Sequence, residues 1–185
     1  MEAAALYAFA GIYAAGVLGW SVVDIGVFGI LAAVVGALGA WLGGMADRAR
    51  GPKPVVAACL VLLIVFSALG VSASREAIFF VVPVEAGSRL PDILFYIAGA
   101  GVGGAGGALQ AASRTLLVRQ AEAGRMTAAF GLYALAGKAT AFLAPLAVAL
   151  ATGVFENQQA GVAPVIGLFL LGLLMLAPVD PEGDR

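Results

Sequence analysis

Lys138 stands alone in a long apolar stretch, and its position predicts chemistry more clearly than that of any other residue. Counted along a helix from Met126 at the membrane edge, it lies about 18 Å deep, near the bilayer centre. A cation there costs about 3 kcal/mol or more, and by default it marks a functional site. Lys138 could hold a substrate carboxylate, or bind and release a proton if burial lowers its pKa. The alternative is a static pairing with a helix carbonyl or an acid.

Three further polar residues could line a substrate or ion pathway with Lys138. Gln110 lies near the end of a helix and can face the pathway, and Tyr133 and Tyr13 could line a cavity. Tyrosines near a membrane surface are more often interfacial belt residues, which is the alternative for both. The helix face around Lys138 is made of small residues, so we expect it to face other helices and not lipid. These residues are Gly131, Ala134, Ala141 and Pro145.

A second cluster, GGMADRARGPK over residues 43–53, combines glycines, an acid and basic residues between two apolar segments. Its carboxylate can accept hydrogen bonds from a neighbouring cation, and its cations can pair with acids or lipid phosphates. Such a cluster can latch two helices together in one conformation and release them in another. The alternative is a simple basic loop, although such a loop does not need an acid. The residues expected to form the latch are Gly44, Asp47, Arg48, Lys53 and Arg114.

Missing residue types exclude several kinds of chemistry. The chain has no histidine, and Cys59 is its single cysteine, so disulfides, thiolate metal sites and imidazole-based catalysis are excluded. A formal net charge of −1 argues against binding of nucleic acid. We therefore predict no enzyme activity, no metal and no cofactor.

The composition requires a membrane. Of the 185 residues, 62% are hydrophobic and 11% are charged, whereas a soluble domain carries roughly 25% charged residues. A bilayer core about 30 Å thick needs roughly 20 apolar residues per helix, and six segments come near that length. We predict a single all-α domain in the lipid bilayer with six transmembrane helices, at residues 3–18, 25–45, 54–72, 92–112, 127–154 and 162–176.

Basic residues predict the orientation, because cytoplasmic loops are rich in Lys and Arg. The breaks after the second and fourth segments hold most of them, which places both termini in the cytoplasm, with a bacterial inner membrane as the expected location. The basic residues in these two breaks are Arg48, Arg50, Lys53, Arg114, Arg119 and Arg125.

Glycine is concentrated in the segments at 25–45 and 92–112, where Gly99, Gly103 and Gly107 repeat every four residues. Small residues at this spacing let helix backbones approach closely, so we expect these two helices to be interior. The bulkier segments at 54–72 and 162–176 suit lipid-facing positions. Three helices followed by three of opposite entry direction predict two inverted repeats, a plan common in transporters. The alternative is a general bias towards Ala and Gly.

Residues 43–53 resemble the Gly-rich, Asp-Arg-x-Gly motif that follows the second helix of each half in the major facilitator superfamily, with glycine one residue late at Gly51. The stretches GGALQAASRTL (106–116), FGLY (130–133) and GK (137–138) narrow the resemblance to the vacuole-effluxer family, whose fungal members export amino acids. A glutamate usual before FGLY is absent here, and the usual Gly-Pro further on is Ala144-Pro145.

The resemblance implies half of a transporter, because family members have twelve helices and this chain matches the last six. The expected function is secondary active transport of a small polar metabolite, with amino acids as candidates, by alternating access. A lone half would need a homodimer or a separate N-terminal half to complete its pathway. The alternative is a non-transporting membrane scaffold or an inactive transporter fragment.

Overall fold

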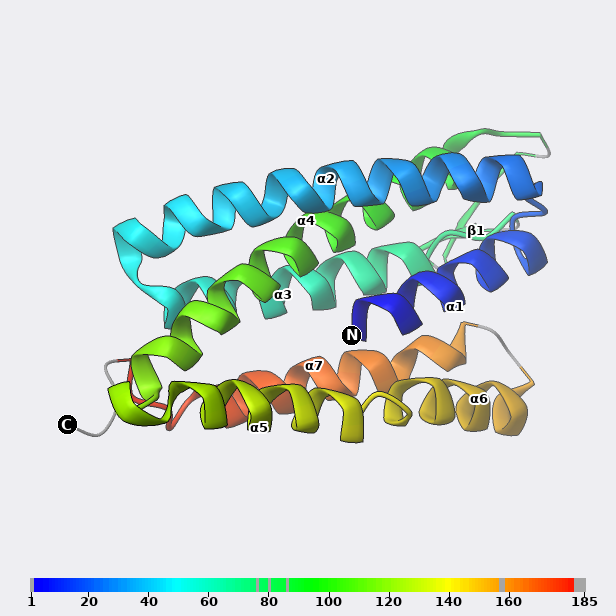
Figure 1. Ribbon diagram of the computed structural model, residues 1–185. Helices are drawn as coiled ribbons and strands as arrows, with labels where there is room; N and C mark the ends of the chain where they lie inside the picture. The colour runs from blue at the N-terminus through cyan, green and yellow to red at the C-terminus, as the bar shows by residue number, and fades with distance from the viewer. Residues whose placement is uncertain (1, 76, 80, 86, 157–158, 182–185) are drawn as a thin grey trace.

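The computed structural model describes residues 2–75, 77–79, 81–85, 87–156 and 159–181, and most of them lie in helices (Figure 1). The helices are α1 (Glu2–Gly16), α2 (Val22–Arg50), α3 (Pro52–Val71), α4 (Leu90–Gln120), α5 (Met126–Ala139), α6 (Leu143–Phe155) and α7 (Ala163–Leu176). Two 3-10 turns, η1 (Ala123–Arg125) and η2 (Ala160–Val162), precede α5 and α7. A short antiparallel hairpin of β1 (Ala77–Ile78) and β2 (Val82–Pro83) lies between α3 and α4.

The helices have the length and composition of membrane spans. Four runs within the described residues are long and apolar enough to cross a bilayer: α2, α3, α4, and α5 with α6 taken together. The helix at Ala160–Leu176 is apolar but shorter. The predicted all-α membrane fold is thus confirmed, and the chain is an integral membrane protein.

Two helices run past the ends that the sequence predicts. α2 continues to Arg50 and not to residue 45, and α4 continues to Gln120 and not to residue 112. The prediction ended each helix where charged residues begin, but charged residues are compatible with a helix that leaves the membrane. At 1.5 Å per residue, α4 is roughly 46 Å long, longer than a bilayer core of about 30 Å.

α2 and α4 pack backbone against backbone, as the glycine spacing predicts. A Cβ placed on Gly43 would lie 2.7 Å from the Cβ of Ala108, and one on Gly36 would lie 3.2 Å from the carbonyl oxygen of Gly103. A Cβ on Gly39 would overlap the backbone of Gly104. Glycine is therefore required here because the two backbones approach too closely for a side chain.

The helices predicted at 54–72 and 162–176, now α3 and α7, were expected to face lipid, and this prediction is wrong for one side of each. α3 lies against α4 and α7, and its Cys59 and Leu63 are buried, as is Phe169 of α7. Val61 and Leu62, on the other side of α3, are exposed. Bulky side chains fill the space beside the small-residue surface of α4, so their size indicates packing as readily as lipid contact.

Aromatic side chains hold together the end of the bundle that carries the β hairpin. Phe95 of α4 stacks on Tyr13 of α1 at a centroid distance of 5.6 Å and on Phe28 of α2 at 5.3 Å. Trp20 meets Phe95 edge to face at 5.4 Å, and it lies 4.7 Å from Tyr96. This cluster ties α1, which is short, to the α2–α4 pair.

The predicted helix at 127–154 is broken near its middle, between α5 and α6 (Figure 1). Pro145 explains the break, because proline has no N–H and its ring clashes with the carbonyl of Ala141 four residues earlier. The hydroxyl of Thr140 donates to the carbonyl of Ala136 at 2.8 Å, a contact that bends helices. No residue of α5 is buried, and in α6 only Ala144 is.

Candidate functional site

Gly51 alone connects α2 to α3, at the centre of the cluster that the sequence singles out. Its backbone has φ 84° and ψ 162°, which favours glycine over any residue with a Cβ. Its N–H donates to the carbonyl of Asp47 at 2.8 Å. Arg50, which stands where the resembled motif has glycine, is the last residue of α2. The glycine that comes one residue late is therefore the one that the turn requires.

Asp47 is buried, with 5% of its surface exposed, and it faces α4. Its carboxylate Oδ1 lies 3.9 Å from Nη2 of Arg119. Arg114, which the sequence predicts as a latch residue, is not the cation beside Asp47; that cation is Arg119, five residues further along. The reason is the length of α4, whose last turn carries Arg119 beyond the predicted helix end. Asp47 Oδ1 accepts no hydrogen bond within the described part of the chain, so the pair is a long-range attraction.

The other expected latch residues have different surroundings. Nζ of Lys53 donates to the carbonyls of Ala177 at 2.8 Å and Val179 at 2.7 Å, just past the end of α7. A lysine there binds carbonyls that the helix leaves free and complements the negative end of its dipole. Arg48 is exposed, and the space around Gly44 is open. Lys53 therefore connects α3 to the end of α7, whereas Asp47 and Arg119 form the contact between α2 and α4.

Gln110 and Arg114 line one groove between α2 and α4, one helical turn apart. Its walls are otherwise made of small residues: Ala32, Ala33, Gly36, Ala40, Gly103, Gly106, Gly107 and Ala111. Both polar side chains are exposed, so they can meet a solute or a partner chain.

Tyr133 joins α5 to the same side of α4. Its hydroxyl lies 3.1 Å from the hydroxyl of Ser113, which in turn donates to the backbone carbonyl of Gln110 at 3.2 Å. The structure thus brings three of the predicted residues, Gln110, Tyr133 and Arg114, to one side of the molecule.

Lys138 lies in the last turn of α5, directly before the break, and its side chain is exposed. The ammonium of Lys138 forms no hydrogen bond or ion pair with the residues that the structure describes, so the static pairing that the sequence left open is not present among them. A Cβ placed on Gly131 or Gly137 would meet nothing within 4 Å. Of the small face that was expected to contact other helices, Gly131, Ala134 and Pro145 are exposed and Ala141 is half-buried, so this face is largely open within the described part of the chain.

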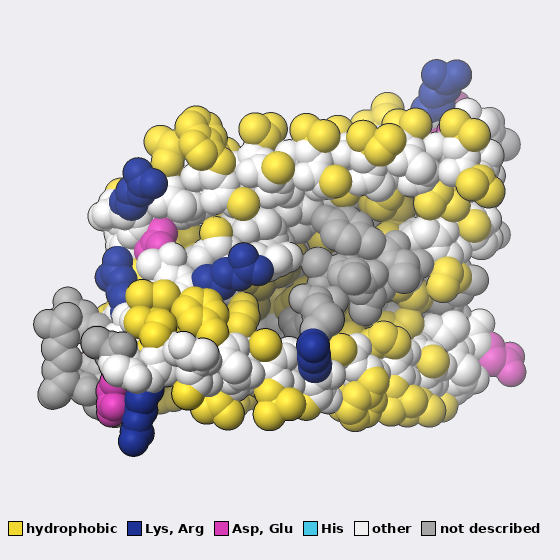
Figure 2. All heavy atoms as spheres, viewed as in Figure 1, with side chains coloured by type: hydrophobic (Ala, Val, Ile, Leu, Met, Phe, Trp, Pro, Cys, Tyr) yellow, Lys and Arg dark blue, Asp and Glu magenta, His cyan; other side chains and the backbone are white. Residues whose placement is uncertain are grey.

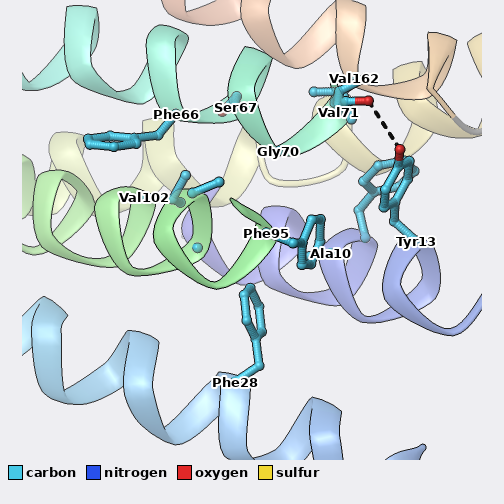
Figure 3. Close-up of a pocket in the computed structure, with 13 residues that line it drawn as sticks. Ala10, Tyr13, Phe28, Phe66, Ser67, Gly70, Val71, Phe95, Val102 and Val162 are labelled. Carbon is cyan, nitrogen blue, oxygen red and sulfur yellow. Dashed lines mark hydrogen bonds between the residues drawn. The ribbon is translucent and has the colours of Figure 1, made fainter. Parts of the chain in front are cut away.

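Tyr13 lies in the interior of the bundle, where it is part of the wall of a small cavity (Figure 3). It is buried at 1% exposure, and its hydroxyl hydrogen is shared between the carbonyls of Ala73 at 2.9 Å and Val71 at 3.1 Å. Its ring stacks on Phe95. Tyr13 is a core residue that joins α1 to the end of α3.

A second polar cluster, which the sequence did not reveal, lies at the opposite end of the bundle. Arg75 forms two 2.9 Å bonds with the carboxylate of Asp92 and donates to the carbonyl of Leu18 at 2.7 Å. The indole N–H of Trp20 donates to the same carboxylate at 2.6 Å. Asp92 lies in the first turn of α4. The signal that could have indicated this cluster is an Arg and an Asp at helix ends on the same side of the membrane.

No group of three or more His, Cys, Asp or Glu side chains within the described ranges could hold a metal ion. Cys59 is buried in the apolar contact between α3 and α4. The cations of the chain gather mainly at the end where α2 and α4 finish (Figure 2).

Comparison with protein families identifies the chain. The sequence model of the family described as "Vacuole effluxer Atg22 like" matches residues 3–185, nearly the whole chain. No curated protein and no solved structure matches it. The chain therefore belongs to this family of effluxers of the major facilitator type, and the resemblance seen in its motifs is confirmed.

Proposed function

We propose that this member of the vacuole-effluxer family forms the C-terminal six-helix half of a secondary transporter that moves a small polar solute by alternating access. The proposal rests mainly on Lys138, whose ammonium has no partner among the described residues. Lys138 lies on an open face of small residues, next to the break between α5 and α6. Family membership supports a transporter in general terms.

Physical chemistry explains why that face needs something beyond this part of the chain. A lysine near the bilayer centre is stable when it meets water, an anion or another polar group, and not when it faces lipid. The backbone groups freed at the break between α5 and α6 have the same need, and non-helical backbone at membrane depth lines cavities or protein contacts. Discontinuous helices of this kind form solute sites in many transporters.

The polar residues favour a solute that carries a carboxylate. The ammonium of Lys138 supplies a positive charge, and Gln110 and Arg114 offer further donors from the groove between α2 and α4. Tyr133 faces Ser113 of α4, about 140° around α5 from Lys138, and offers its hydroxyl there. Charge-assisted hydrogen bonds of this type are roughly twice as strong as neutral ones. Amino acids fit this chemistry and agree with the kind of transport that the family performs.

The positive charges of Lys138 and Arg114 help to decide which second protein half completes the transport pathway. In a two-fold homodimer the same patch meets itself, so Lys138 and Arg114 would face their own copies across the cavity. Like charges at close range are unfavourable, especially in a low dielectric. We therefore favour a separate N-terminal half that carries acids or other acceptors, with the homodimer as the second arrangement.

The Asp47–Arg119 pair would act as the conformational latch of this half. Because the two groups are 3.9 Å apart and form no hydrogen bond, their attraction is weak enough to be broken and remade during a transport cycle. The basic end of the bundle would face the cytoplasm, with both termini on that side. The family description names the vacuole, so it gives no support to a bacterial inner membrane.

Transport by a Lys138→Ala variant separates this function from a non-transporting scaffold. Cells whose gene is replaced by each variant provide native membrane vesicles, which are loaded with ¹⁴C-labelled amino acids so that efflux is followed. We expect Lys138→Ala to lose roughly tenfold or more of the flux and Lys138→Arg to retain a part, because the charge is kept. Arg48→Ala is the matched control, since that side chain is exposed. Equal flux with Lys138→Ala and Arg48→Ala, at equal protein levels, would contradict the proposal.

A further inference from the structure

A second groove lies on the side of the bundle where α2 and α3 both pack against α4. It has a volume of about 530 Å³ and shares no residue with the groove that holds Gln110. Small residues of α4, among them Gly104 and Ala108, form its floor, and leucines of α2 and α3 stand along its rims. These leucines are about half exposed, so in a membrane the groove opens toward lipid. They are Leu38 (54%), Leu42 (56%) and Leu62 (44%).

Arg50 stands at one end of this groove, and it is the one charged side chain among the described residues that line it. It is exposed, and it lies on the same face of α2 as Ala46 and Gly43, one and two turns earlier. Its guanidinium forms no hydrogen bond or ion pair with the described part of the chain. The turn into α3 uses the positive φ of Gly51 and does not involve this side chain. Neither the turn nor a partner among these residues therefore accounts for a cation at the end of an apolar groove.

The length of α2 places Arg50 at the level of the lipid headgroups. The 29 residues of this helix span about 43 Å, and a bilayer with its headgroups is about 40–45 Å thick. The helix end that carries Arg50 therefore lies in the headgroup layer. Val35, at the other end of the groove, lies about 22 Å deeper along α2, near the bilayer centre. The groove thus runs through one leaflet, from the headgroups to the midplane.

We propose that this groove binds one anionic phospholipid. An acyl chain lies in the groove between Leu42 and Leu62, and the phosphate pairs with the guanidinium of Arg50. A guanidinium binds phosphate through two parallel hydrogen bonds, and basic residues just beyond a membrane helix attract anionic lipids. Arg48 and Lys53 raise the positive charge at the same end, which favours an anionic headgroup over a zwitterionic one.

Stabilisation of the purified chain by added lipids tests the site. Thermal unfolding in detergent is followed at increasing lipid concentration, because a ligand that binds only the folded state raises the Tm in a saturable way. The probes are dioleoylphosphatidylglycerol, which is anionic, dioleoylphosphatidylcholine, which is zwitterionic, dioleoylglycerol, which has no phosphate, and glycerol 3-phosphate, which has no acyl chain. Each probe is compared across variants in the same detergent, so its partition into the micelle cancels.

Two variants are each paired with a control. Arg50→Gln removes the charge at the end of the groove, and Arg48→Gln removes a charge that lies about 160° around α2 from it. Ala58→Trp fills the groove from α3. Ala37→Trp places the same bulk at an exposed position of α2 that does not line the groove.

We expect phosphatidylglycerol to bind more tightly than phosphatidylcholine or dioleoylglycerol, and glycerol 3-phosphate to have no effect. Arg50→Gln should weaken phosphatidylglycerol binding roughly tenfold and leave dioleoylglycerol unchanged, because the phosphate loses its hydrogen bonds. Arg48→Gln should weaken it only about two- to threefold, through the loss of charge alone. Ala58→Trp should weaken every probe that has acyl chains, and Ala37→Trp should weaken none.

Three results would overturn the proposal. Equal losses with Arg50→Gln and Arg48→Gln, or equal affinities for phosphatidylglycerol and phosphatidylcholine, would mean that the lipid has no specific contact at Arg50. Unchanged binding with Ala58→Trp would mean that the acyl chains lie elsewhere. Light scattering without added lipid gives the mass of the protein, and a dimer that Ala58→Trp dissociates would mean that a second copy fills the groove. The readout needs no transport, so failure here leaves the proposed function intact.

Discussion

The α2–α4 pair and the α5–α6 pair are both rich in small residues, yet their surroundings are opposite. In the first pair, a Cβ on Gly39 or Gly107 would overlap the backbone of the facing helix. In the second pair, a Cβ on Gly131, Gly137 or Gly153 would meet nothing within 4 Å. Figure 2 shows apolar side chains along α2 and along α5 and α6.

The difference teaches that a small-residue pattern indicates close approach without identifying the partner. α2 finds its partner in α4, within the same six helices. α5 combines the same kind of face with a lysine, and no described residue covers it. The most direct explanation is that its partner, a second half or a solute-filled cavity, lies outside the part of the chain that the structure describes.

The same substitution in the two pairs should have the most unequal effects. Gly39→Leu should prevent native packing of α2 on α4, at a cost of about 3 kcal/mol or more, because its side chain meets backbone that cannot move aside. Gly131→Leu should change the stability of the isolated chain by less than about 0.5 kcal/mol. Unfolding in a graded series of denaturing detergent measures both. Similar losses of unfolding free energy in the two variants would show that the α2–α4 and α5–α6 pairs do not differ in their packing.

Arg75→Ala should have the next largest effect. It removes the two bonds to Asp92 and the bonds to Leu18, and among the described side chains it leaves Trp20 as the remaining donor to the carboxylate. We expect a loss of about 2 kcal/mol in the free energy of unfolding. Arg89→Ala is the control, since Arg89 is exposed at the same end of the bundle. Equal stability of the two variants would show that the cluster does not hold α1 to α4.

Asp47→Asn should separate stability from transport. The substitution keeps the shape of the side chain and removes a weak 3.9 Å attraction, so we expect a stability loss below about 1 kcal/mol. Efflux should fall several-fold, because the latch no longer favours one conformation. Vesicle efflux and detergent unfolding are measured on the same preparations, with Arg48→Gln as the control. Unchanged efflux would show that Asp47 has no role in the conformational change during transport.

Lys53→Met should have the smallest effect. The variant keeps the apolar stem but loses two hydrogen bonds to carbonyls beyond α7, in a partly exposed position. We expect a loss of about 0.5–1 kcal/mol and faster hydrogen exchange confined to the end of α7. An equal increase of hydrogen exchange in α5 would contradict this prediction. It would mean that the bonds of Lys53 also stabilise α5 and α6.

Local patterns in the sequence predicted the helices and one helix contact, because hydropathy and glycine spacing report directly on bilayer length and backbone approach. They did not predict that α4 extends to Arg119, because charged residues are compatible with a helix outside the membrane. The buried position of Tyr13 could not be predicted, because the sequence does not distinguish a tyrosine at a membrane interface from one whose hydroxyl bonds to distant carbonyls. The Arg75–Asp92 pair depends on a contact 17 residues apart, for which the chain carries no local pattern.

Thiol accessibility on α5 tests the central claim most directly. Cys59 is replaced by Ala, and single cysteines are placed at Lys138 and at Ala136, which lie about 160° apart around the helix. Native membranes are treated with a water-soluble, charged thiol reagent, which reacts with the thiolate that forms only in water. The account predicts rapid labelling at position 138 and slow labelling at position 136. Equally slow labelling at both positions would mean that the Lys138 face meets lipid, and it would contradict the half-transporter account.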